Sequence, residues 1–263
     1  DDRHFLARGR LCLEDGVEAD RVHHGGGIEA EHPVIPGSGH VGVLGHRGDE
    51  QPVLRADHRN RGKSDWTETE VTTRDFLGQY VSMAPGKKTK TLFWADDRVY
   101  WVVTSGQMRV TIEGVEPFIA SRGFLVQVPY RVPYSMETVG DEPVVRFEVL
   151  PAGETPSYPV SETPAPAKGM KFIKAVYTGQ GKYEGVNKPF IDFEKDIVAA
   201  NGKGGGAVRD DHTWANIIRS RGVPTPPDTS WGHFHENFAE FWLIMEGKEE
   251  FLIEGVPLIT AEF

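Results

Sequence analysis

The sequence predicts an all-β protein in which one β unit occurs twice. From Asp65 onward, short apolar runs recur about every ten residues, with Gly and Pro between them. Helical periodicity is almost absent over the same part of the chain. A segment near residue 100 returns, with similar residues at the same spacing, near residue 241. Together these observations favour two tandem sandwiches or barrels of short strands.

The individual elements follow from period-two alternation or from continuous apolar runs. Strands are predicted at 76–83, 99–103, 108–113, 117–120, 124–128 and 144–149. The one helical prediction is about two turns over 193–200, with Asp192 as the capping residue.

The repeat joins two segments that lie about 141 residues apart. Trp101 matches Trp242, and Gly106 matches Gly247. The four residues 112–115, Ile-Glu-Gly-Val, recur unchanged at 253–256, and a Pro then follows in both copies with one residue inserted. This period is too long for a solenoid, so the pattern indicates a duplicated β domain.

Composition divides the chain into four parts. Residues 1–64 hold seven of the ten His but only one Lys, and they show little periodicity. They are interpreted as an N-terminal extension of low order, as a segment foreign to the rest or translated out of frame, or as a partner-binding arm. Residues 65–150 form the first β domain, 151–169 a linker with five Pro, and 170–263 the second β domain.

Charge and cysteine content narrow the classes of function. With 39 acidic and 29 basic residues, the net charge of −10 argues against nucleic acid as the main partner. Cys12 is the single cysteine, which excludes an intramolecular disulfide framework and a cysteine metal cluster. No apolar run has the length of a membrane helix, so a soluble protein is expected, and a cytoplasmic one is favoured.

The residues with metal chemistry lie just upstream of the second copy of the repeat. On a strand, His233 and His235 point the same way while Phe234 points to the other face. Glu240 begins the next predicted strand and can reach the same space. Two imidazoles and one carboxylate suit Fe(II) or Mn best, and Ni, Zn or Cu are alternatives. Phe234, Phe241 and Trp242 are candidates for a substrate pocket, or they simply pack.

The spacing of His233, His235, Glu240 and Gly247 resembles the first motif of the cupin superfamily. With the internal repeat, the chain resembles a bicupin, over about 75–150 and 210–263. The resemblance implies two jelly-roll barrels of the double-stranded β-helix type. One departure is Pro227, which stands where the family usually has Gly.

In the first copy, the resemblance implies a degenerate site. Gly123 and Pro129 match the second cupin motif in identity and spacing. Arg131, however, stands where the motif usually has Gly, and Tyr134 stands where it usually has His. The places of the first-motif ligands hold Leu92, Trp94 and Val99. The first barrel is therefore expected to be structural. In the second copy, the third His ligand would fall about 11 residues after Phe263, so this barrel is expected to be incomplete within the sequence.

The resemblance implies a metal-dependent enzyme that acts on a small, oxygen-rich organic substrate. Dioxygenases, decarboxylases, isomerases and lyases all occur among cupins, and a dioxygenase-like oxidoreductase is slightly favoured because an N/O set with open positions suits Fe(II). The alternative is a non-catalytic module that binds or stores a small molecule. A monomer and a homo-oligomer both remain open.

Overall fold

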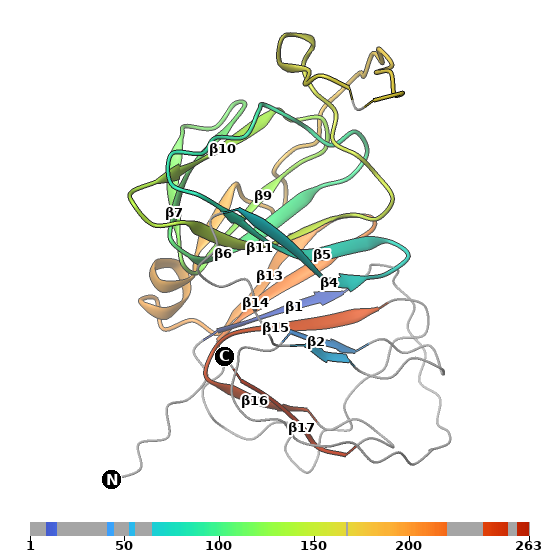
Figure 1. Cartoon of the computed structure of the whole chain (residues 1–263). Helices are drawn as coiled ribbons and strands as arrows, with labels where there is room; N and C mark the ends of the chain where they lie inside the picture. The colour runs from blue at the N-terminus through green and yellow to red at the C-terminus, as the bar shows by residue number, and fades with distance from the viewer. Residues whose placement is uncertain are drawn as a thin grey trace. The chain divides into compact units, whose positions relative to one another are not determined.

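A computed structural model describes residues 9–14, 41–44, 53–55, 65–166, 168–219, 239–251 and 257–262. The chain forms two compact units. We call Asn60–Asp192 the barrel unit, and Asp1–Arg59 together with Phe193–Phe263 the composite unit. The all-β prediction is confirmed, because strands dominate both units (Figure 1). None of the helices in the described ranges is long and apolar enough to cross a membrane.

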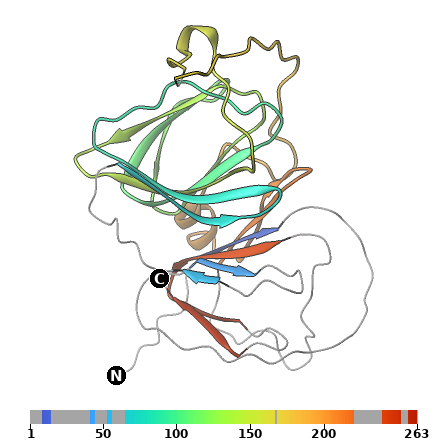
Figure 2. The same cartoon turned by 45° about the vertical axis from the view of Figure 1, so that its right-hand side comes forward.

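The barrel unit consists of two antiparallel sheets that face each other (Figure 2). The larger sheet has the order β12-β9-β6-β11-β5-β4, and the smaller one has the order β10-β7-β8. The strands of the larger sheet are β4 (Trp66–Thr72), β5 (Phe76–Met83), β6 (Val99–Ser105), β9 (Phe124–Val128), β11 (Val144–Pro151) and β12 (Phe190–Asp192). Those of the smaller sheet are β7 (Gln107–Ile112), β8 (Phe118–Ser121) and β10 (Tyr134–Val139).

Alternation along each strand builds the core between the two sheets. On β7, for example, Met108, Val110 and Ile112 are buried while the residues between them are exposed. The chain crosses from the larger to the smaller sheet at Gly106, whose φ is +73°. A Cβ at this position would overlap the carbonyl oxygen of Pro143, so only glycine fits the turn.

The predicted strands of the first copy all form, within one or two residues of their expected ends. Two strands within residues 65–150 were not predicted. These are β4, which carries alternating Thr and Glu, and β10, in which buried polar residues interrupt the apolar pattern. The predicted helix at 193–200 is a short π-helical segment over Phe193–Val198.

Residues after the predicted linker extend the barrel unit. The Tyr183 hydroxyl donates to the Gln127 carbonyl oxygen at 2.9 Å, and Gly181 N donates to the Tyr130 carbonyl oxygen at the same distance. Further along, Phe190 on β12 packs its ring against those of Phe118 and Phe124. Residues 170–192 therefore belong to the barrel unit, whereas the sequence placed them in the second domain.

The composite unit contains a six-stranded sheet and a separate hairpin. The sheet has the order β13-β14-β1-β15-β2-β3, and β16 pairs with β17. Its strands are β1 (Gly9–Glu14), β2 (Val41–Leu44), β3 (Val53–Arg55), β13 (Gly204–Arg209), β14 (Trp214–Ile218) and β15 (Glu240–Glu246). The hairpin strands are β16 (Lys248–Phe251) and β17 (Ile259–Glu262). Three segments of the first 64 residues thus lie in a sheet with strands from the end of the sequence.

The repeat is visible in the backbone of the two units. Adding 141 to the residue numbers of β6 gives those of β15, and adding 141 to those of β8 gives those of β17. The strands therefore keep one offset, although the sequence aligned the Pro between them with one residue inserted. Gly247 has a φ of +83°, close to that of Gly106. In each unit, the strand before this glycine lies in a six-stranded sheet and the strand after it lies in a smaller one.

Candidate functional site

The cupin resemblance assigns four ligand places to the first copy, and the structure brings all four to one buried cluster. Leu92 and Tyr134 exchange backbone hydrogen bonds at 3.0 and 2.9 Å. Trp94 Nε1 donates to the Tyr134 hydroxyl oxygen at 3.2 Å. The fourth place, Val99, begins β6 and belongs with Trp94 and Tyr134 to one buried cluster. These positions contribute packing and one phenol, and no imidazole or carboxylate.

Arg131 has a backbone conformation that glycine adopts more easily than other residues. Its φ is +60°, a left-handed conformation that costs a side-chain-bearing residue about 1 kcal/mol. The cost is offset by hydrogen bonds. Arg131 N donates to the Trp94 carbonyl oxygen, and the guanidinium donates to the Ala95 and Thr178 carbonyl oxygens at 2.7 Å each. Arg131 therefore fastens the turn after Trp94 to the segment near residue 178.

A buried charge pair lies inside the barrel, and the sequence analysis did not identify it. Arg146 Nε and Nη2 both lie 2.9 Å from Glu148 Oε2. Gln79 Nε2 donates to the other carboxylate oxygen, also at 2.9 Å. Because side chains alternate along β11, Arg146 and Glu148 share the inward face of Val144, a member of the core cluster. The available signal was an Arg and a Glu at i and i+2 on the strand predicted at 144–149.

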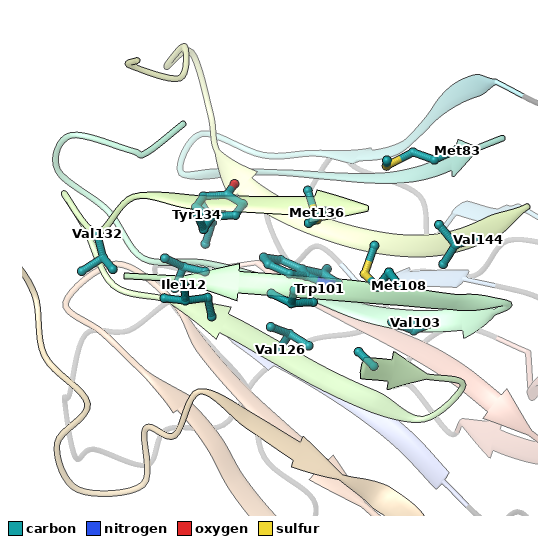
Figure 3. Packing of buried hydrophobic residues seen from close by; sticks show 14 of the residues in the cluster. Met83, Trp101, Val103, Met108, Ile112, Val126, Val132, Tyr134, Met136 and Val144 are labelled. Carbon is teal, nitrogen blue, oxygen red and sulfur yellow. The ribbon is translucent and has the colours of Figure 1, made fainter. Parts of the chain in front are cut away.

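Tyr134 interacts both with Trp94 and with the charges of Arg146 and Glu148. Its ring stacks on Trp101, with 5.6 Å between ring centroids, and Figure 3 shows the two side by side within the cluster. Burial, followed by the Glu148 charge, raises the pKa of the Tyr134 phenol well above its ordinary value, although the Trp94 hydrogen bond and the Arg146 charge act the other way. The phenol consequently keeps its proton at neutral pH and can donate it.

In the composite unit, the structure describes one of the three predicted metal ligands. Glu240 is the first residue of β15 and is 7% exposed. Next to it, Phe241 is fully buried, and Trp242 packs its ring 5.5 Å from that of Phe251. His233, His235 and Phe234 lie outside the described residues.

A second carboxylate–imidazole pair lies on the turn between β13 and β14. A carboxylate oxygen of Asp210 and a ring nitrogen of His212 lie within 4.8 Å of each other. The turn is held by Asp210 N, which donates to the Thr213 carbonyl oxygen, and by Trp214 Nε1, which donates to the Asp210 carbonyl oxygen. A carboxylate and an imidazole are both side chains that bind divalent transition metals.

Comparison with solved structures finds cupins. One is an RmlC-like cupin family protein with a double-stranded β-helix fold from Methanocaldococcus jannaschii, with 20% identity over 36% of this chain and 86% of that chain, and a TM-score of 0.33. Another is the Cnp3 cupin domain of Schizosaccharomyces pombe, with 15% identity, coverage of 38% and 74%, and a TM-score of 0.32. A third is the DMSP lyase DddQ of Ruegeria pomeroyi, with 14% identity, coverage of 40% and 56%, and a TM-score of 0.35.

No family model matches the sequence, and no curated protein matches it. These likenesses concern the fold alone, and they do not identify a reaction. The chemistry of the site has to be drawn from the residues of this chain.

Proposed function

We propose that this chain, a protein with the cupin fold, is a metal-dependent enzyme whose metal is held in the composite unit by His233, His235 and Glu240. The observation that carries the proposal is the placement of Glu240. Glu240 is 7% exposed at the start of β15, so its carboxylate lies inside the composite unit rather than in solvent. The sequence sets two imidazoles five and seven residues before it.

The residues present suit a divalent transition metal, with Fe(II) or Mn favoured. When bound, such a metal supplies Lewis acidity toward substrate oxygens or a site for O₂. Glu240 contributes the negative charge of the ligand set. Its burial excludes water, which strengthens electrostatic interactions at the site. The substrate class is a small, oxygen-rich organic molecule, and a dioxygenase-like reaction is favoured over a decarboxylase, lyase or isomerase reaction.

The test is the metal content of the full chain and of matched variants. The unaltered protein, purified without chelator, should hold about one equivalent of transition metal by elemental analysis. His235→Ala and Glu240→Gln should each lose at least tenfold in metal affinity, since each removes one ligand. Glu250→Gln, an exposed position on β16, is the control and should retain the metal. Equal metal contents in all four proteins would refute the assignment of ligands.

A second candidate function is a non-catalytic module that binds a small molecule. The barrel unit favours it, because its ligand places hold Leu92, Trp94, Val99 and Tyr134 rather than metal-binding side chains. If the full chain purified anaerobically holds no stoichiometric metal and His235→Ala changes no property, this second function replaces the first.

A further inference from the structure

The barrel unit displays an apolar and basic segment on its surface. We call residues 170–177, Met-Lys-Phe-Ile-Lys-Ala-Val-Tyr, the basic segment. Every residue in it is exposed, and its aliphatic side chains face solvent, with Ile173 91% exposed and Val176 93% exposed. From Thr163 to Tyr183 the sequence has Lys but neither Asp nor Glu. Apolar side chains gathered in this way are typical of a surface that a partner covers.

The backbone of the basic segment is available for pairing. It runs without a turn or bend, and the described part of the chain offers no backbone hydrogen bond to residues 170–176. Its far end is anchored, because Arg131 Nη1 donates to the Thr178 carbonyl oxygen at 2.7 Å. Figure 1 shows this part of the chain, in yellow to tan, as loops that project from the sheets. Such a backbone can add as a strand to the edge of a sheet.

The larger sheet of the barrel unit ends in an edge of opposite charge. Among the described strands, β4 is the last in the sheet order and pairs with β5 alone. It carries two Glu and no basic residue. Glu68 Oε2 is buried and has no hydrogen-bond partner within the described ranges, so a cation beside this carboxylate would be favourable. Two such acidic edges repel each other, whereas a strand that carries Lys suits this one.

One antiparallel register matches the two segments in charge and in polarity. It sets the Lys174 ammonium opposite the Glu68 carboxylate, and on the same face it sets Val176 opposite the Trp66 ring. The pairing ends at the bulge that follows Thr69, where β4 loses its regular spacing. The register joins four pairs, which are Trp66 with Val176, Thr67 with Ala175, Glu68 with Lys174, and Thr69 with Ile173.

The charge of the chain favours a second copy as the partner over an anionic membrane. With a net charge of −10, most of the protein surface would be repelled by acidic lipid headgroups. Each copy carries both the basic segment and the acidic edge. Two copies can therefore exchange strands reciprocally, which closes the contact into a dimer.

We propose that residues 173–176 of one copy add as an antiparallel strand to the edge of β4 in a second copy, so that the protein forms a strand-exchanged dimer. None of the predicted metal ligands takes part in this contact. The dimer goes beyond the proposed metal-dependent function, and its test does not depend on bound metal.

The experiment measures the mass of the full chain by sedimentation velocity over about a hundredfold range of concentration. The unaltered protein should change from monomer to dimer. Ile173→Pro removes a backbone donor that the added strand needs, and should raise the dimer dissociation constant at least about tenfold. The fold should tolerate this change because Ile173 is exposed. Ala165→Pro, at an exposed position before the basic segment, is the matched control and should dimerise like the unaltered protein.

Charge reversal tests the register. Lys174→Glu should weaken dimerisation about fivefold, because it sets like charges opposite each other, and Glu68→Lys should do the same. A chain with both substitutions should recover the affinity of the unaltered protein. In hydrogen-exchange mass spectrometry, residues 173–176 should exchange more slowly at high concentration than at low concentration.

Three outcomes would overturn the proposal. The first is a monomer at every concentration, including the case in which that monomer cosediments with vesicles of phosphatidylserine and phosphatidylcholine. The second is an Ile173→Pro protein that dimerises as tightly as the Ala165→Pro control. The third is a doubly reversed chain that dimerises no more tightly than the single variants.

Discussion

At the scale of single residues, two positions of the barrel unit hold side chains other than those usual in the second cupin motif. Arg131 occupies a left-handed backbone position and compensates with bonds to the turn after Trp94 and to Thr178. Tyr134 occupies a ligand place and receives a hydrogen bond from Trp94. The sequence analysis identified both residues as departures, but their partners could not be predicted, because the bonded groups lie more than 30 residues away along the chain.

Two substitutions of Arg131 separate backbone strain from side-chain bonding. Arg131→Gly and Arg131→Ala both lose the guanidinium hydrogen bonds, but only glycine relieves the left-handed strain. Both variants should be less stable than the unaltered protein in urea unfolding, and the Ala variant should be less stable than the Gly variant by about 1 kcal/mol. An Ala variant at least as stable as the Gly variant would contradict the assigned conformation.

The buried pair of Arg146 and Glu148 predicts a non-additive response. Arg146→Met alone leaves the Glu148 carboxylate buried without its cation, and should cost about 3–5 kcal/mol in free energy of unfolding. Arg146→Met together with Glu148→Gln should cost clearly less, because no buried charge remains. Denaturant unfolding of the two variants checks this. A double variant that loses as much stability as Arg146→Met alone, or more, would contradict the pairing of the two side chains.

The buried phenols predict a loss of stability in alkali. Burial raises the pKa of both Tyr134 and Tyr183 above the ordinary tyrosine value near 10. Above that value the unfolded chain releases phenol protons that the folded chain keeps, so stability is complete below pH 10 and falls as pH rises further. Each phenol should contribute a slope of about 1.4 kcal/mol per pH unit. Unfolding measured between pH 9 and 11 should show a shallower decline in Tyr134→Phe, and Tyr177→Phe, at an exposed position, serves as control.

At the scale of elements, local pattern predicted the strands that show period-two alternation or a continuous apolar run. The strands β5, β6, β7 and β9 combine apolar inward positions with flanking Gly or Pro, and such signals do not depend on distant residues. The strands β1 and β2 could not be predicted in the same way, because each contains Gly and pairs with residues more than 150 positions later. The strand β3 has only three residues, too few to show a pattern. These three strands complete a six-stranded sheet. The six-stranded sheet of the barrel unit is instead built entirely from residues 66–192.

The position of β1 predicts slow amide exchange near the start of the chain. This strand pairs with β14 on one side and β15 on the other, so both sets of its backbone groups are bonded. In hydrogen-exchange mass spectrometry, residues 10–13 should exchange about as slowly as β15 and more slowly than the edge strand β13. Exchange at the rate of an unstructured peptide would favour the alternative that this segment is a separate extension.

At the scale of the whole molecule, the two units share a strand plan but carry different side chains at corresponding places. The barrel unit has Val99 at the start of β6, where the composite unit has Glu240 at the start of β15. The same place in the strand plan thus holds a packing side chain in one unit and a carboxylate in the other. The sequence predicted this difference through the repeat, whereas the buried pair inside the barrel required the three-dimensional register.

The proposed metal site predicts that chelation affects one unit only. Dialysis against EDTA should speed amide exchange in β14 and β15, because a ligand that binds only the folded form stabilises it. The strands β5 and β6 of the barrel unit should exchange at the same rate before and after, since the ligand places there hold packing residues. Equal effects in both units, or an effect confined to β5 and β6, would contradict the placement of the metal.

The contact between Trp101 and Tyr134 also has an optical consequence. Two rings with centroids 5.6 Å apart, held in a fixed orientation and shielded from water, have coupled electronic transitions. Light absorbed by the phenol should pass to the indole, and the pair should give a strong near-ultraviolet dichroism band. The barrel unit thus carries its own chromophore, one that reports on the packing of its interior without any added label.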